Sequence, residues 1–273
     1  MRAAPCEGVS DRAKKGYAGV MAPCYQRLMP YLRALKLLFV VIFGVVALAP
    51  VQTFARRRRD WRLQDKIQTG FCRAACRAIG LRIAARGALP DQAPRLVVAN
   101  HVSWTDIIAL ASIYPFVFLS KSEVNSWPLL GLLARVQGTI FVVRDARRDI
   151  ARASGALADA LDAGRDVVVF PEGTSTDGRE ILPFRPGPFE ALQKTGGPAV
   201  VAPVALRYTD IAGHPVDLGW YGDMTLVDHI RKLLRQNGAI CHIRFGEAII
   251  PTGVDRKTTA MLAEKQVRAL HAD

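Results

Sequence analysis

The chain has 273 residues, 50% of them hydrophobic, and a formal net charge of +13. Length and composition allow one sizeable core with a small appendage rather than two equal domains. The charge excess lies entirely in the first third. Residues 1–86 hold 17 Lys and Arg against 4 Asp and Glu, whereas residues 87–273 hold 20 against 20. The neutral second part, whose aromatic residues are not interleaved with basic ones, argues against a nucleic-acid partner.

The most apolar stretch runs from Leu37 to Val51, and basic residues flank it, with Arg33 and Lys36 before it and Arg56–Arg59 after it. This pattern indicates membrane lipids as partners, because each juxtamembrane cation contributes about 1 kcal/mol of attraction to an anionic leaflet. A full span needs about 20 apolar residues, so a spanning helix and a half-immersed one both remain open. The Arg cluster predicts a bacterial-type inner membrane with the globular part on the cytoplasmic side.

A secretory signal is the alternative, since Ala47-Leu48-Ala49 resembles a cleavage site. We favour the membrane segment, because the charged stretch before it is too long for a usual signal and Pro50 follows the supposed site. The cysteines agree with a reducing compartment. They are five in number and include no C-x-x-C pair, so neither a disulfide framework nor a zinc site is predicted.

The pattern from about residue 60 to Ile79 predicts a helix that ends at Gly80 and links the membrane segment to a domain. After Pro90, short apolar runs alternate with helix-length segments, which predicts an α/β fold with a single sheet flanked by helices. The predicted strands are Arg95–Ala99, Phe116–Leu119, Thr139–Val143, Asp166–Phe170, Ala199–Leu206 and Ala239–Phe245. The predicted helices are Trp104–Ser112, Trp127–Val136, Arg147–Ala163, Pro188–Lys194 and Leu226–Leu234. We therefore expect a basic segment 1–86, with a membrane helix at about 35–55, and a domain 87–273.

Four charged or reactive residues follow the predicted strands at the point where each strand ends: His101, Lys121, Arg144 and Glu172. In α/β sheets the ligand crevice lies at the carboxyl ends of the strands. We therefore expect these four side chains to share one pocket.

His101 and Asp106 lie five residues apart, around the predicted start of a helix. If Ser103 caps that helix, the carboxylate can fold back onto one imidazole nitrogen and leave the other free as a general base. Ser103-x-x-Asp106 is also a capping box, in which the aspartate only stabilises the helix start. His242 and Glu247 have nearly the same spacing on a predicted strand, so spacing alone does not decide between the two interpretations.

The second constellation is the strand and turn from Val167 to Ser175. Gly173 allows backbone to approach a ligand closely, and the amides and hydroxyls of the turn, with Lys121 and Arg144, would form an anion site. Glu172 would hold an arginine or accept a ligand hydroxyl. An ordinary β-turn with a surface acid is the alternative.

Several motifs together resemble a known family. NHVSWTD around His101, KSE at Lys121–Glu123, GTIFVVR ending at Arg144, FPEGT at Phe170–Thr174 and VAPV at Val201–Val204 are similar to the four blocks of glycerolipid acyltransferases. The resemblance covers about residues 60–250 and is closest to 1-acylglycerol-3-phosphate O-acyltransferases.

The resemblance implies that His101 deprotonates the acceptor hydroxyl, which attacks an acyl thioester directly, while Asp106 orients His101. It also implies that Arg144, Glu172 and Gly173 bind the acceptor, with Lys121 and Thr174 as additions. The acyl donor would be acyl-CoA or acyl-carrier protein and the acceptor a lysolipid. We expect no metal or redox cofactor, because His and Cys show no ligand spacing.

One departure from the family pattern affects the expected acceptor. Family members often carry arginine after the FPEGT threonine, whereas this chain has Ser175, with Arg179 and Arg185 further on. This form resembles a subgroup that includes lyso-ornithine lipid acyltransferases. We rank lysophosphatidate first, because Arg144 and the other basic residues suit a phosphate, and lyso-ornithine lipid or another lysophospholipid second.

Two other classes of protein fit the sequence less well than an acyltransferase. A hydrolase would need a nucleophile, and the chain has no G-x-S-x-G elbow, H-E-x-x-H motif or P-loop. A non-catalytic membrane-binding protein would use the basic and apolar amino end, but would have no need of His101 and Asp106 in register.

Overall fold

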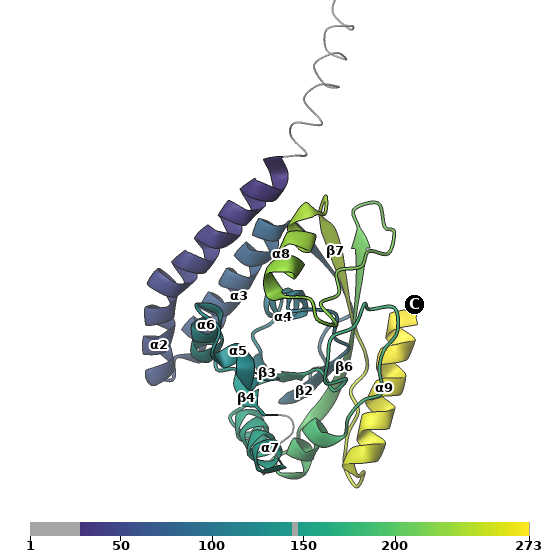
Figure 1. Ribbon diagram of the computed structural model, residues 1–273. Coiled ribbons are helices and arrows are strands. Elements are labelled where there is room, and N and C mark those ends of the chain that lie inside the picture. Colours follow the sequence, from purple (N-terminus) through teal and green to yellow (C-terminus); the bar gives the residue numbers. More distant parts are fainter. Residues whose placement is uncertain (1–27, 144–146, 273) are drawn as a thin grey trace, which may run out of the picture.

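The computed structural model describes residues 28–143 and 147–272 (Figure 1). Within those residues the core is one seven-stranded sheet in the order β1-β7-β6-β2-β5-β3-β4. The strands are β1 (Leu81–Arg86), β2 (Arg95–Ala99), β3 (Val117–Lys121), β4 (Ile140–Val142), β5 (Val167–Val169), β6 (Val200–Asp210) and β7 (Ala239–Phe245). From β6 to β4 neighbouring strands are parallel, while β7 is antiparallel to β6 and parallel to β1. The predicted single α/β sheet is confirmed.

Helices cover both faces of the sheet. They are α3 (Trp61–Ile79), α4 (Thr105–Ala111), α5 (Ser122–Asn125), α6 (Leu130–Val136), α7 (Arg147–Asp162), the 3-10 helix η2 (Gly187–Gln193), α8 (Leu226–Arg235) and α9 (Arg256–Ala272). Val97 of β2 packs with residues of α3, α4 and α8, on what we call the α4 face. The next residue, Val98, packs with residues of α7, η2 and α9, on the α9 face. Buried on both faces, β2 is the central strand and can carry functional residues at its end.

The predicted helix from about residue 60 to Ile79 is α3. The Asp60 carboxylate accepts a hydrogen bond from the Leu63 N–H at 3.1 Å and caps its start. Gly80, at φ 76°, ends it in a left-handed conformation that suits glycine. Cys72 and Cys76 both lie on its buried face, and burial raises the pKa of the Cys76 thiol to about 12. These cysteines are therefore core residues and remain protonated.

The structure departs from the prediction in several elements. Strand β1 and helices α5 and α9 were not predicted, the expected helix 127–136 is shortened to α6 at its carboxyl end, and the expected helix 188–194 is the 3-10 helix η2. β1 is the edge strand beside β7, so the sheet begins before residue 87, where the domain was expected to start.

The N-terminal helix, Leu28–Arg57, includes a π-helical segment, Gly44–Leu48, and ends in α2 (Ala49–Arg57). The π turn ends two residues before Pro50, which has no N–H to continue the α-helical hydrogen bonds. The helix is apolar and long enough to be a candidate membrane segment.

This helix runs beside α3 (Figure 1) and contacts the domain near both of its ends. Arg33 donates to the Gln236 carbonyl oxygen, and Arg56 donates to the Arg135 carbonyl oxygen at 2.8 Å. Between them Gly44 allows close packing, because a Cβ there would lie 2.5 Å from the Phe71 ring. The opposite side exposes large apolar side chains, among them Phe39 and Val46. One side on the domain and one apolar side exposed favour the half-immersed alternative over a perpendicular span.

If the exposed apolar side enters a bilayer, Phe39→Asp with Val46→Asp should lower partitioning into neutral phosphatidylcholine vesicles by at least about 10-fold, since burying each side chain contributes about 1.5–3 kcal/mol. Vesicle flotation measures this. The matched control is Ile250→Asp with Met261→Asp, because these residues are 63% and 62% exposed against 68% and 70% for Phe39 and Val46. Equal flotation of the two double variants would contradict the assignment.

Candidate active site

The end of β2 is fixed to β6 by a side chain. Asn100 donates its amide N–H to the Leu206 carbonyl oxygen at 2.9 Å and accepts from the Leu206 N–H at 2.7 Å. The amide group imitates a strand residue and extends the β2–β6 pairing one residue beyond β2. As a result, the backbone of His101 leaves the sheet at a defined position on its carboxyl edge.

His101 and Asp106 form a pair at this edge. The imidazole Nδ1 lies 2.8 Å from Asp106 Oδ2, which also accepts the Val102 and Ser103 N–H groups at 2.7 and 2.9 Å. Because an oxygen with two amide donors acts as an acceptor, Nδ1 carries the proton and Nε2 keeps its lone pair. The His101 side chain is 18% exposed and that of Asp106 is fully buried. The pair therefore presents one basic nitrogen and hides the carboxylate.

The two interpretations of Asp106 apply together. Its bond from the Ser103 N–H is the reciprocal contact of a capping box, while the same oxygen binds the His101 ring. The helix start and the histidine are thus held by one carboxylate. The other pattern of similar spacing is not used in this way, because His242 Nε2 lies 2.9 Å from the Thr209 hydroxyl.

A buried tyrosine that the sequence did not reveal completes the surroundings of Asp106. Tyr208, on β6, donates its hydroxyl to Asp106 Oδ1 at 2.6 Å. The Thr105 hydroxyl lies 3.0 Å from the same phenol, and the Ser103 hydroxyl lies 2.6 Å from that of Thr105. Since the Tyr208 proton points to the carboxylate, Thr105 donates to Tyr208 and Ser103 donates to Thr105. Burial and the charge of Asp106 raise the pKa of Tyr208 well above its ordinary value, which keeps the phenol a donor.

The turn after β5 lies against His101. The Phe170 ring stacks on the imidazole with centroids 4.1 Å apart, and the Thr176 N–H donates to the His101 carbonyl oxygen at 3.0 Å. Gly173 has φ 78°, and a Cβ there would lie 2.8 Å from the Arg185 guanidinium. The positive φ favours glycine here, and the absence of a Cβ lets the Arg185 guanidinium lie against the turn. The predicted juxtaposition of His101 and the FPEGT turn is confirmed.

Glu172 is a buried carboxyl that joins the loop of His101 to the loop of Leu182 through hydrogen bonds. Its Oε1 accepts the His101 N–H and its Oε2 accepts the Leu182 N–H, both at 2.7 Å, and the residue is 2% exposed. Burial raises the pKa of this carboxyl to about 7, although the two amide bonds lower it. These partners are backbone amides, rather than the arginine or ligand hydroxyl that the sequence suggested.

The remaining predicted binding residues are placed less closely. Lys121 ends β3, which lies two strands from β2, so its backbone is roughly 10 Å away along the same edge. Lys121 and Thr174 are both exposed. Arg144 lies outside the described residues. The structure thus brings His101, Asp106, Glu172 and Gly173 together and leaves Lys121 at the periphery.

His229 is a buried histidine close to the site with a different task. The Trp104 ring N–H donates to its Nδ1 at 2.9 Å, so the Nε2–H donates to the Leu218 carbonyl oxygen at 2.9 Å. Burial lowers its pKa and keeps it neutral. Both ring nitrogens are therefore used in fixing α8 and its preceding loop. The described residues contain no group of three or more His, Cys, Asp or Glu that could hold a metal ion.

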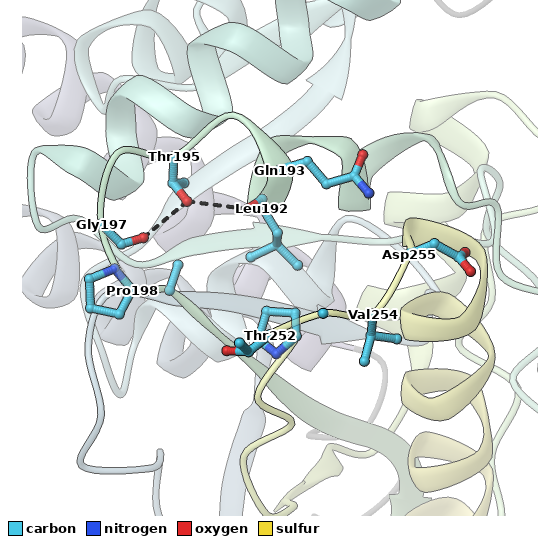
Figure 2. Close-up of a pocket in the computed structure, with 11 residues that line it drawn as sticks. Leu192, Gln193, Thr195, Gly197, Pro198, Thr252, Val254 and Asp255 are labelled. Atoms are coloured by element: carbon cyan, nitrogen blue, oxygen red, sulfur yellow. Dashed lines mark hydrogen bonds between the residues drawn. The ribbon is translucent and has the colours of Figure 1, made fainter.

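A cavity of about 460 Å³ opens between the end of η2 and the start of α9 (Figure 2). Its lining includes Pro198 and Ala199, which precede β6, whereas His101 follows the other end of the adjacent strand β2. It thus lies at the opposite edge of the sheet. Its charged residue, Asp255, is used in capping α9 through the Thr258 N–H at 3.0 Å. This cavity is therefore separate from the candidate active site.

The sequence model of the family described as Acyltransferase matches residues 80–207. A lyso-ornithine lipid O-acyltransferase of Brucella abortus is 36% identical over 85% of this chain and 93% of its own length. This chain belongs to the acyltransferase family. A 1-acyl-sn-glycerol-3-phosphate acyltransferase of Neisseria meningitidis is 35% identical over 65% of this chain and 69% of its own.

The fold also matches a solved structure. The crystal structure of the 1-acyl-sn-glycerophosphate acyltransferase of Thermotoga maritima superimposes with a TM-score of 0.62 at 20% identity, over 91% of this chain and 98% of that one. A mixed sheet flanked by helices is thus shared with that acyltransferase at low sequence identity. The motif-based recognition of an acyltransferase is confirmed.

If Tyr208 orients Asp106, Tyr208→Phe should lower kcat about 10-fold and leave KM within about twofold, because one hydrogen bond to a buried carboxylate is lost. Tyr221→Phe is the matched control, since its hydroxyl also binds an aspartate, Asp217, but at the surface. Steady-state kinetics and thermal melting of both variants separate orientation from stability. An unchanged kcat in a folded Tyr208→Phe variant would show that the phenol plays no part.

Glu172 predicts a pH dependence of stability. Since its folded pKa of about 7 exceeds the ordinary value of 4.5, the native state binds more protons between these values, and stability falls as pH rises through them. Glu172→Gln should be less stable at every pH, because its NH₂ would face an amide donor. The stability of the variant should not decline over this range. The difference in melting temperature between wild type and Glu172→Gln should therefore narrow from pH 4.5 to 7. A constant gap would contradict the shifted pKa.

Proposed function

We propose that this acyltransferase moves a fatty acyl group from a thioester, acyl-CoA or acyl-carrier protein, onto the free hydroxyl of a lysolipid at the inner membrane. The single observation that supports it most is the free Nε2 of a histidine whose Nδ1–H is held by a buried carboxylate. A hydroxyl is a poor nucleophile until its proton is removed, and this nitrogen would remove it in the proposed reaction.

In the proposed reaction His101 Nε2 takes the proton of the acceptor hydroxyl as its oxygen attacks the thioester carbonyl carbon. The carbon–sulfur bond then breaks, and the imidazolium returns the proton to the departing thiolate. Asp106 stabilises the transient imidazolium and holds the ring, as its bond to Nδ1 indicates. Neither step needs an acyl-enzyme, a metal or a redox group.

We propose lyso-ornithine lipid as the first acceptor, which reverses the ranking expected from the sequence. Relatives with that name include proteins of Brucella abortus and Rhizobium meliloti, at 36% and 37% identity. Ser175 lies where the resemblance predicts an arginine. Arg179 forms an ion pair with Asp177. The guanidinium that lies against the FPEGT turn is that of Arg185. One guanidinium suits the single carboxylate of an ornithine headgroup. Lysophosphatidate remains the second candidate, supported by the Neisseria relative.

The N-terminal helix supports the proposed location. A lysolipid acceptor resides in the bilayer, and the apolar side of Leu28–Arg57 would hold the domain against it. The cytoplasmic side is proposed from the Arg cluster at residues 56–59, whose four charges favour an anionic leaflet.

The decisive experiment measures acyl transfer from acyl-CoA and from acyl-carrier protein to lyso-ornithine lipid and to lysophosphatidate. We expect the higher kcat/KM with lyso-ornithine lipid and a loss of about 10²- to 10⁴-fold in His101→Ala. His214→Ala, which removes a 78% exposed imidazole, is the control and should keep full activity. Transfer to neither acceptor, or activity that survives His101→Ala, would reject the proposal, while preference for lysophosphatidate would restore the first ranking.

A further inference from the structure

Four arginines lie together on the α9 face of the sheet, beside the carboxyl end of α9, where Arg244 donates to the Leu270 carbonyl oxygen at 2.9 Å. Leu81 and Ile83 of β1 pack on the α4 face, so the alternate residues Arg82 and Arg86 point to the α9 face. The strand register places Arg86 beside Arg244 of β7, and Arg207 of β6 beside the neighbouring His242. We call Arg82, Arg86, Arg207, Arg244 and His242 the basic face.

Within the part of the chain that the structure describes, no acidic side chain neutralises the basic face. None of its four arginines takes part in an ion pair among residues 28–143 and 147–272. Arg82 and Arg86 are exposed, and Arg207 and Arg244 are half-buried. The arginines 244, 207 and 86 also help burial to lower the pKa of His242. Like charges this close repel one another, and an anionic partner would relieve that repulsion.

A cavity of about 500 Å³ connects the basic face with the active-site loop. Arg207 and Tyr208 are neighbours on β6 that point to opposite faces of the sheet, yet both line this cavity. Val102, which follows His101, lines it too. The cavity therefore crosses the carboxyl edge of β2, from the basic face towards the residues around Asp106. His271 is also in its lining, with an Nε2 atom that is buried and has no hydrogen-bond partner among the described residues.

The position of the basic face indicates which kind of anionic partner it would bind. The N-terminal helix packs with α3 on the α4 face, through residues such as Ala34 and Leu37, whereas the basic face lies on the α9 face. A membrane held by that helix would therefore lie on the other side of the sheet. The arginines span β1, β7 and β6, which is about 10 Å across. This spread suits an extended acidic surface better than a single phosphate group.

We infer that the basic face docks an acidic carrier protein that brings the acyl thioester to His101. The inference rests on the proposed function, because it assigns the route of the donor in that reaction. Complementary charge would speed the encounter and orient the carrier, and the cavity beside Arg207 marks the edge over which its thioester arm would pass. Acyl-CoA, which lacks the protein surface, would need only the active site.

The test compares two donors in one double variant. Arg82→Gln with Arg86→Gln should raise KM for an acyl-carrier protein thioester about 3- to 10-fold, because rim charges each contribute modestly. KM for acyl-CoA and kcat with either donor should stay within twofold. Arg152→Gln with Lys257→Gln, on α7 and α9, removes the same charge from exposed positions outside the basic face and should change neither donor. Direct titration of acyl-carrier protein against the full chain in neutral detergent should show the same loss of affinity.

Different results would contradict the docking site and the proposed function. An unchanged KM for the carrier thioester, or an equal rise in both double variants, would overturn the docking site while leaving acyl transfer intact. Weaker binding of the Arg82→Gln, Arg86→Gln variant to phosphatidylglycerol vesicles, with unchanged carrier binding, would overturn it in favour of a lipid surface. Absence of acyl transfer in the wild type from either donor would instead reject the proposed function, independently of the basic face.

Discussion

The buried carboxylate of Asp106 is the interaction on which the rest of the site depends. It has no exposed surface and binds four donors, from His101, Val102, Ser103 and Tyr208. A buried carboxylate without such partners would cost several kcal/mol, so the fold must bring all four to it. The first turn of α4, the end of β2 and the middle of β6 are thereby joined at one point. The contacts that stabilise the fold thus also fix the orientation of His101, which is set before any substrate binds.

How much of the site could be predicted depends on how far apart in the sequence the contacting residues lie. His101 and Asp106 are five residues apart across a helix start, so the local spacing was informative. Tyr208 reaches the same carboxylate from β6, and no local pattern distinguishes its face or its partner. Glu172 was found by its motif, but its partners were not, because the Leu182 and His101 amides approach only in the folded chain.

The helices and strands that were not predicted also depend on contacts between residues far apart in the sequence. β1 contains two arginines and three alanine or isoleucine residues, a weak strand signal, and is held by β7, far along the chain. α9 buries mainly small residues such as Ala260 and Ala263, so its apolar periodicity is faint. The expected helix 127–136 begins only at Leu130, because Leu129 has a positive φ of 61° and cannot continue a right-handed helix. In each case tertiary packing overrides local preference.

In the proposed function, the choice of acceptor depends on the position of one arginine. The sequence showed basic residues suited to a phosphate, but it could not show which of them reaches the FPEGT turn. In the fold Arg179 extends into solvent beside Asp177, while the Arg185 guanidinium lies against Gly173. Moving the cation from the position of Ser175 to Arg185 would change the direction from which it meets a headgroup and would leave the pairing of His101 with Asp106 unchanged. Under the proposed function, catalysis depends on His101 and Asp106 and headgroup selection on the turn, so related chains would share the chemistry and differ in acceptor.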